Sequence, residues 1–187
     1  MATYFVNATG TSTPPFNSSA TGATNFTALL GAVTIAVGDI IETVYGFNID
    51  NSEATVPITI DNVTIRSWSG NSHKPDVIGP TAAPLFALSG PESRIIGLSM
   101  VKIGPNATGS IVRYDGNVIS SELRDNRFTI ANTSGSTAVG IDVQDKTFSS
   151  ELLITGNKFR NTVKGVNIGV VPSISIAVMS NYYAQMR

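Results

Sequence analysis

Short apolar runs dominate the chain from residue 39 onward, and Gly, Asn, Asp, Ser and Pro separate them. Runs of β-branched and aromatic residues that turn formers bound are typical of strands. We expect strands within residues 39–45, 56–60, 63–68, 84–88, 94–103, 110–114, 122–130, 138–143, 151–159, 163–170 and 174–179. No helical spacing appears between these runs, which argues against a doubly wound α/β fold.

The stretch 1–38 follows a different pattern. Residues 3–6 are predicted to form a short strand, and residues 7–24 have the composition of a loop. A single helix is then predicted, with Thr24 or Asn25 as its N-cap and Gly38 at the position after its C-terminus. Its apolar positions at helical spacing are Phe26, Leu29, Leu30, Val33 and Val37. We therefore expect a single domain over 1–187, with strand, loop and capping helix in 1–38 and the remaining strands in 39–187.

A repeat connects the strand-forming runs. The stretch Ser120–Phe128 is echoed further along the chain by Ser149–Phe159. A second track of apolar residues recurs at similar intervals, at Phe86, Val112, Ile141 and Val166. Periods of roughly 20–50 residues are the sequence signature of a solenoid.

A solenoid of this kind stacks each strand in parallel on its copy one coil away, about 4.8 Å along the axis. We predict an all-β, right-handed parallel β-helix of about five coils with an N-terminal capping α-helix; the alternative is an antiparallel β-sandwich or jelly roll. Asn126, Asn157 and Asn181 are expected at the same bend of successive coils. They form either a hydrogen-bonded structural ladder or a set of residues that tolerate a left-handed backbone at bends.

These coil phrases resemble a known family. Leu123–Phe128 and Ile154–Asn161 are similar to the coil repeat of the pectate-lyase-like superfamily of right-handed parallel β-helices. The stretch 4–38, followed by 39–41 and 62–65, is similar to the capped entry of that superfamily, in which a helix plugs the first coil. The resemblance implies the fold. It implies little about activity, because enzymes, phage spikes and surface proteins share these motifs.

Catalytic motifs of the superfamily are missing from the sequence. There is no Asn-Thr-Asp, Asp-Asp, Gly-His-Gly or Arg-Ile-Lys, and the single histidine, His73, falls in a predicted loop. We therefore predict no catalytic residues, no metal ligands and no cofactor, and the chain is interpreted as non-enzymatic. Asp115, Asp142 and Asp145 remain a candidate carboxylate set for glycoside hydrolysis, which needs two carboxylates across a cleft.

Four residues are candidates for ligand binding. Glu92, Glu122 and Glu151 recur at nearly equal intervals and are expected to stack at one bend. Stacked carboxylates repel unless a cation, a proton or solvent relieves them, so they form either a cation or sugar site or three solvated turn residues. Trp68 is expected either to stack on a sugar ring or to cover an open seam of the coil.

The charge and composition of the chain limit the classes of binding partner that we expect. Charged residues make up 13% of the chain, about half of the usual ~25%, and the net charge is −1. No basic stripe occurs, so nucleic acid binding is not expected, and no apolar run of about 18 residues occurs, so membrane insertion is not expected. Cysteine is absent, which excludes disulfides and thiolate metal sites. A surface rich in hydroxyls and amides tolerates close packing between copies better than a charged one.

The predicted C-terminal end of the solenoid suggests self-association, because the sequence shows no cap there. The last predicted strand is followed only by 180–187, and no capping helix is visible. Solenoids normally need capped ends, so we expect that another copy covers this end, that the tail folds back over it, or that the sequence is a piece of a longer chain. The residues of the expected self-association end are Ile174, Ile176, Val178, Tyr182 and Tyr183.

The sequence thus favours a structural protein that associates with itself, as a homo-oligomer or filament. We expect it at a cell surface, in an extracellular filament or in a virion appendage. The alternatives are a polysaccharide-binding or polysaccharide-cleaving module and a receptor-binding fragment of a phage spike.

Overall fold

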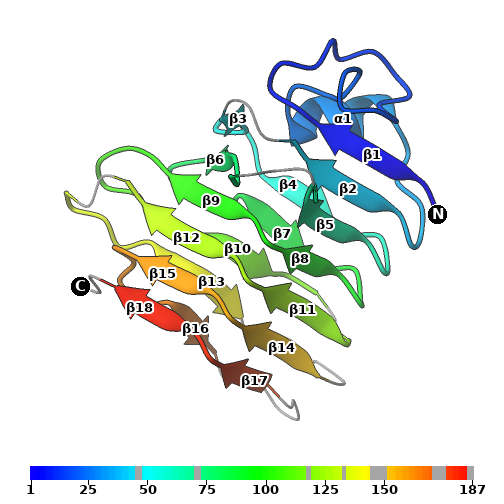
Figure 1. The fold of residues 1–187 in the computed structure, drawn as a ribbon. Coiled ribbons are helices and arrows are strands. Elements are labelled where there is room, and N and C mark those ends of the chain that lie inside the picture. Colours follow the sequence, from blue (N-terminus) through cyan, green and yellow to red (C-terminus); the bar gives the residue numbers. More distant parts are fainter. Residues whose placement is uncertain are drawn as a thin grey trace.

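The chain forms three parallel β-sheets, A, B and C, that wind around a common core (Figure 1). The computed structural model describes residues 1–44, 48–69, 73–116, 119–131, 134–143, 151–169 and 176–184. Within these ranges the chain passes repeatedly from sheet A to sheet B to sheet C, and four turns separate the first and last strands of sheet C. The predicted all-β parallel solenoid is confirmed.

Each sheet takes one strand from each complete coil. Sheet A contains β1 (Thr3–Val6), β2 (Ile40–Thr43), β5 (Thr64–Ser67), β8 (Arg94–Ile96), β11 (Ser121–Arg124), β14 (Leu152–Thr155) and β17 (Ile176–Met179). Sheet B contains β3 (Ile49–Asp50), β6 (Asp76–Gly79), β9 (Ser99–Lys102), β12 (Arg127–Ile130), β15 (Lys158–Arg160) and β18 (Tyr182–Ala184). Sheet C contains β4 (Val56–Ile58), β7 (Phe86–Leu88), β10 (Ser110–Tyr114), β13 (Val139–Val143) and β16 (Val166–Ile168).

Columns of apolar side chains fill the core, because alternate residues of every strand point inward. The track predicted from the sequence is one such column: Val112 pairs with Phe86 on one side and with Ile141 on the other, and Ile141 pairs with Val166. In sheet A the corresponding buried column is Ile41, Ile65, Ile95, Leu123 and Ile154. Each coil therefore buries its inner side chains against those of its neighbours.

Several of the expected long strands are pairs of short ones. The run 94–103 divides into β8 and β9, because Gly97 has a φ of +72° and turns the chain by one corner of the solenoid. The runs 122–130 and 151–159 divide in the same way. The short strands β3, β6 and β18 were not anticipated, because each lies outside the apolar runs.

The N-terminal helix is shorter than the spacing of its apolar residues predicts. Helix α1 (Phe26–Ala32) begins after Asn25, whose side chain accepts a hydrogen bond of 2.8 Å from the Ala28 amide. It ends at Ala32 because Val33 is extended, and β-branched residues at 33–35 disfavour further turns. Gly38, expected at the helix terminus, instead lies in a turn in which the Asp39 amide donates to the Ala36 carbonyl.

Helix α1 and the preceding loop close the N-terminal end of the solenoid. The buried ring of Phe26 packs edge-on against Phe86, with 5.1 Å between ring centroids. On strand β1, the amide of Phe5 donates to Phe16 and its carbonyl accepts from Ala23, so the loop occupies the outer edge of the strand. Within the described ranges, no helix has the length and hydropathy of a bilayer span.

Candidate functional site

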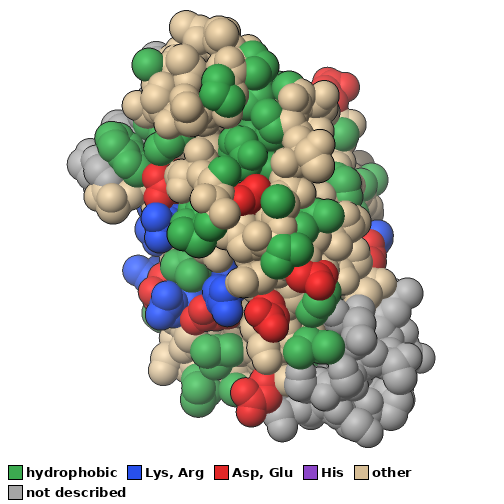
Figure 2. Space-filling model, turned by 90° about the vertical axis from the view of Figure 1, so that its right-hand side faces the viewer, with side chains coloured by type: hydrophobic (Ala, Val, Ile, Leu, Met, Phe, Trp, Pro, Cys, Tyr) green, Lys and Arg blue, Asp and Glu red, His purple; other side chains and the backbone are tan. Residues whose placement is uncertain are grey.

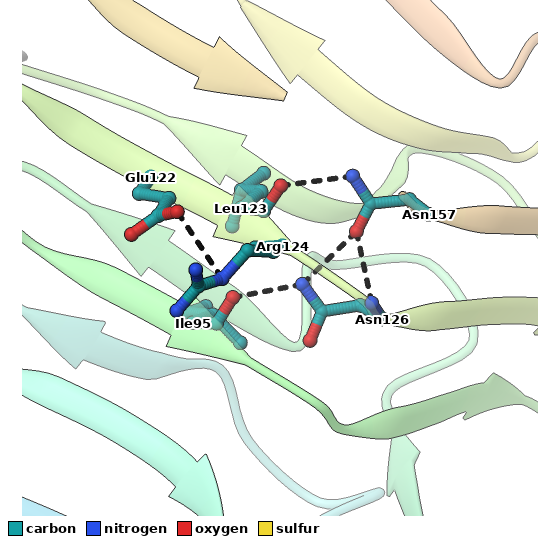
Figure 3. A network of polar contacts seen from close by, with 6 residues as sticks. All are labelled: Ile95, Glu122, Leu123, Arg124, Asn126 and Asn157. Atoms are coloured by element: carbon teal, nitrogen blue, oxygen red, sulfur yellow. Dashed lines mark hydrogen bonds and ion pairs between the residues drawn. The ribbon is translucent and has the colours of Figure 1, made fainter. Parts of the chain in front are cut away.

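A ladder of asparagines runs along the corner between sheets A and B (Figure 3). Asn157 Oδ1 accepts hydrogen bonds from the backbone amide and Nδ2 of Asn126, at 3.0 and 3.1 Å. Asn181 Oδ1 accepts the equivalent pair from Asn157, at 2.9 and 3.1 Å. Each Nδ2 also donates to a carbonyl of sheet A, as Asn157 does to Leu123 at 2.9 Å. The three asparagines therefore join successive coils at a corner where the backbone leaves the sheet ladder.

The left-handed backbone of this corner belongs to the preceding residue and not to the asparagine. Asp125, Gly156 and Ser180 have φ values of 56°, 66° and 52°. The asparagines follow them, and Asn126 and Asn157 are buried. Of the two interpretations of these residues, the structure thus shows the hydrogen-bonded arrangement.

The ladder ends at Asn181, in the last described coil. Nδ2 of Asn181 donates to the Ile154 carbonyl. Among the described residues, no asparagine of a following coil accepts a hydrogen bond from the Asn181 backbone amide. The ring stack ends at the same level: Phe159 stacks on Phe128 at 4.9 Å between centroids, and Tyr183 stacks on Phe159 at 5.1 Å. The asparagine ladder and the ring stack thus end at Asn181 and Tyr183, and no described residue of a further coil packs against the outer side of either.

Inward-facing side chains of the last coil are exposed where their equivalents one coil earlier are not. Val178 is 39% exposed, whereas its register partner Ile154 is fully buried. Tyr183 is 43% exposed and Ile168 is 46% exposed, whereas their partners Phe159 and Val143 are fully buried. The outward-facing Met179 and Tyr182 of the same coil are also exposed.

The residues expected at the self-association end thus lie together on this coil. Ile176 and Val178 are on β17, and Tyr182 and Tyr183 are on β18. Ile174 lies outside the described residues. We define the open end as the apolar side chains that the last coil leaves exposed, namely Ile168, Val178, Met179, Tyr182 and Tyr183.

The three candidate glutamates do not form one column. Glu122 pairs in register with Arg94 and Leu153, whereas Glu151 precedes Leu152, which pairs with Ser121. The two Ser-Ser-Glu motifs are therefore not aligned by the pairing of β11 with β14, because Glu122 pairs with Leu153 and Glu151 lies two positions earlier. The buried partners Leu123 and Ile154 set this register, and a slip would break the asparagine ladder as well.

Charge around the glutamates is partly neutralised. Glu122 forms an ion pair with Arg124 on the same strand, with 3.3 Å between Oε1 and Nε (Figure 3). Glu122, Glu151 and Arg94 line one shallow pocket of about 210 Å³, and Glu92 is an exposed residue of the turn before β8. Figure 2 shows one face of the solenoid, on which basic and acidic side chains lie close together along the left flank and further acidic side chains lie across the middle.

Trp68 is half-buried and lies far from the glutamates along the sheet. It follows the C-terminal end of β5, and its amide donates to the Thr43 carbonyl at 3.0 Å. The glutamates lie at the N-terminal ends of sheet-A strands or just before them. The four candidates therefore do not converge on one site.

Two of the three aspartates that were candidates for glycoside hydrolysis form polar contacts on sheet C. Asp115 forms a bidentate ion pair with Arg113, and Asp142 accepts a hydrogen bond of 2.8 Å from Asn167. Asp145 lies outside the described residues, and His73 is exposed. Among the described residues, no three His, Cys, Asp or Glu side chains gather closely enough to hold a metal ion.

Two of the buried polar groups, on Lys102 and Tyr114, have unusual surroundings that the sequence did not predict. Lys102 is fully buried, and its Nζ donates to the carbonyls of Thr81, Ala83 and Thr108 at 3.3, 2.7 and 2.7 Å. Burial lowers the pKa of Lys102 to about 8. Its burial could have been predicted from its position two residues after Met100, because alternate residues of a strand point to the same side.

The other buried group is Tyr114. Its ring fills the core, its hydroxyl has no hydrogen-bond partner among the described residues, and burial raises the pKa of that hydroxyl far above its ordinary value.

Comparisons with known proteins leave the family open. No family model, no curated protein and no solved structure matches this chain. The assignment of the parallel solenoid therefore rests on the sheet topology and the registers described above.

Proposed function

We propose that this chain is a non-enzymatic structural β-solenoid that associates with a copy of itself through its open end. The observation that carries the proposal is the exposure of Val178, Tyr183 and Ile168, whose partners one coil earlier are fully buried. One coil cannot bury its own inner face, so a solenoid coil gains its stability from a neighbour. A second copy supplies an equivalent apolar surface and equivalent strand edges.

The two ends of the solenoid differ, and this difference favours a closed pair. The N-terminal edge is occupied by helix α1 and by the loop that hydrogen-bonds to Phe5. A filament needs two complementary ends, whereas a two-fold dimer uses the same surface on both copies. We therefore propose a pair in which the open ends of two copies meet.

The low charge of the chain supports close contact between copies. With a net charge of −1 and 13% charged residues, long-range repulsion between copies is weak. Such a module suits a cell surface, an extracellular filament or a virion appendage, and we place it in the pectate-lyase-like superfamily on the strength of its coil phrases. These assignments of location and superfamily belong to the proposal.

Light scattering coupled to size-exclusion chromatography tests the association. The wild-type protein is expected to have the mass of a dimer, which dissociates on dilution. Val178→Lys places a charge in the contact and is expected to give a monomer, because a buried unpaired charge costs several kcal/mol, on the order of 3 or more.

Val37→Lys is the matched control. Val37 is 64% exposed and lies near the closed end, so this variant is expected to remain a dimer. Circular dichroism establishes that each variant retains its β structure. A wild-type protein that stays monomeric at every concentration, or a dimer that both variants disrupt equally, rejects the proposal.

A further inference from the structure

Basic side chains gather on the outer face of sheet B near the open end. Arg127 of β12, Lys158 of β15 and Tyr182 of β18 are aligned in register, and all three are exposed. Arg160 extends outward from β15 in the next column. We call Arg127, Lys158, Arg160 and Tyr182 the sheet-B patch.

Positive charge in this patch has no acidic partner among the described residues. The ion pairs that the described residues form involve Arg66, Arg113 and Arg124, which lie on sheets A and C. Like charges directly opposite each other on neighbouring strands are destabilising. Arg127 and Lys158 occupy such positions, about 4.8 Å apart along the solenoid axis.

A further lysine adds to this charge. Lys74 lies close enough to Lys158 to be affected by it: the pKa of Lys74 is lowered first by burial and to a smaller extent by Lys158, while Asp125 acts in the opposite direction. Among the described residues, Arg127, Lys158 and Arg160 thus form no ion pair with a carboxylate, although the whole chain has a net charge of −1.

The patch surrounds a shallow pocket of about 300 Å³. The outward side chains of Arg127, Lys158, Arg160 and Tyr182 line it. Tyr182 is 62% exposed and offers an apolar ring with a polar tip, which suits stacking on a sugar ring. The neighbouring cations suit a group with three terminal oxygens, because such a group accepts hydrogen bonds from more than one cation at once.

We propose that the sheet-B patch binds a sulfated polysaccharide, with a sulfate ester between Arg127 and Lys158 and a sugar ring against Tyr182. This site shares Tyr182 with the open end, but Tyr182 faces outward beside Lys158, whereas Tyr183 faces inward beside Phe159. The site goes beyond the structural role proposed above. The glycan is favoured over nucleic acid because the basic cluster is small and the whole chain is not basic.

Biolayer interferometry on immobilised dextran sulfate and unsulfated dextran tests the site, because the two polymers share one backbone. The wild-type protein is expected to bind dextran sulfate and not dextran, with affinity that falls as NaCl is raised. Lys158→Gln is expected to weaken binding about five-fold or more, which is the loss of one charge-assisted contact.

Lys164→Gln on the sheet-C side is the matched control, because Lys164 is also an exposed lysine and the change in net charge is the same. It is expected to leave binding nearly unchanged. Equal weakening by the two variants indicates a net-charge effect and overturns the proposal, as does a failure to bind dextran sulfate. Equally tight binding of single-stranded oligothymidylate, with the same loss in Lys158→Gln, assigns the patch to nucleic acid and overturns it too.

Discussion

At the scale of single residues, Lys102 is the most unusual feature of the core. A fully buried ammonium normally costs more than it gains, but here it donates to three carbonyls at the corner between sheets B and C. Carbonyls at such corners have left the sheet ladder and need donors. Lys102 therefore acts as an internal brace between consecutive coils.

The stability of the protein is expected to depend on pH through Lys102. Its folded-state pKa of about 8 lies below the ordinary value of 10.5, so the folded state releases this proton first. The free energy of unfolding is then lowest below pH 8 and rises by about 2 kcal/mol between pH 8 and pH 10. Urea denaturation across this range measures the rise.

Lys102→Met is the control for this titration, because it keeps a long unbranched side chain and removes the charge. The variant is expected to lose the rise between pH 8 and pH 10. The range stops at pH 10 because the strongly raised pKa of Tyr114 acts in the opposite direction once unfolded tyrosines ionise. Equal pH profiles for the two proteins count against the role of Lys102.

At the scale of elements, the corner between sheets A and B holds the coils in register. A residue of positive φ turns the chain, and the asparagine after it bonds to the coils on either side. Register matters because a slip of one residue turns every inward side chain outward. The ladder and the apolar columns specify the same register.

Removal of one rung is expected to be costly in the middle of the ladder and mild at its end. Asn157→Ala removes the acceptor of the buried Asn126 amide and one hydrogen bond to the Leu123 carbonyl, so it should lower the free energy of unfolding by about 3 kcal/mol. Asn181→Ala removes bonds at a partly exposed position, and about 1 kcal/mol is expected. Chemical denaturation of both variants makes the comparison, and equal losses would show that the ladder adds nothing specific to the core.

Sequence patterns predicted most of the elements but not where they divide. The column through Phe86 and Val112 was visible because inward residues of a solenoid recur at the coil period. The division of 94–103 at Gly97 was not, because both halves are apolar and a short corner leaves little trace in hydrophobicity.

The glutamates illustrate the same limit for the site. The Ser-Ser-Glu motif places Glu151 as the counterpart of Glu122, whereas the strands pair Glu122 with Leu153, so motif spacing misplaced the two carboxylates relative to each other. The sheet-B patch was missed because Arg127 is far in sequence from Lys158 and Arg160 and adjoins them only after β12 pairs with β15.

At the scale of the whole molecule, the two ends of the solenoid determine what it can assemble with. One end has its strand edge and its core covered by the loop and by helix α1, and the other exposes inward-facing apolar side chains. If the open ends pair as proposed, each copy has one surface for this contact, and a two-fold pair uses that surface on both copies. We therefore predict a closed pair of limited length.

Distances between spin labels on two copies test this claim most directly, because the chain has no cysteine and one introduced cysteine carries one label. Ala177→Cys on β17 places the label at the open end, and Gly31→Cys places it on helix α1, where an added side chain meets no atom within 4 Å. Double electron–electron resonance is expected to give a short, defined distance between copies for Ala177→Cys and none as short for Gly31→Cys. A short distance between Gly31 labels, or between an Ala177 label on one copy and a Gly31 label on another, would contradict the account.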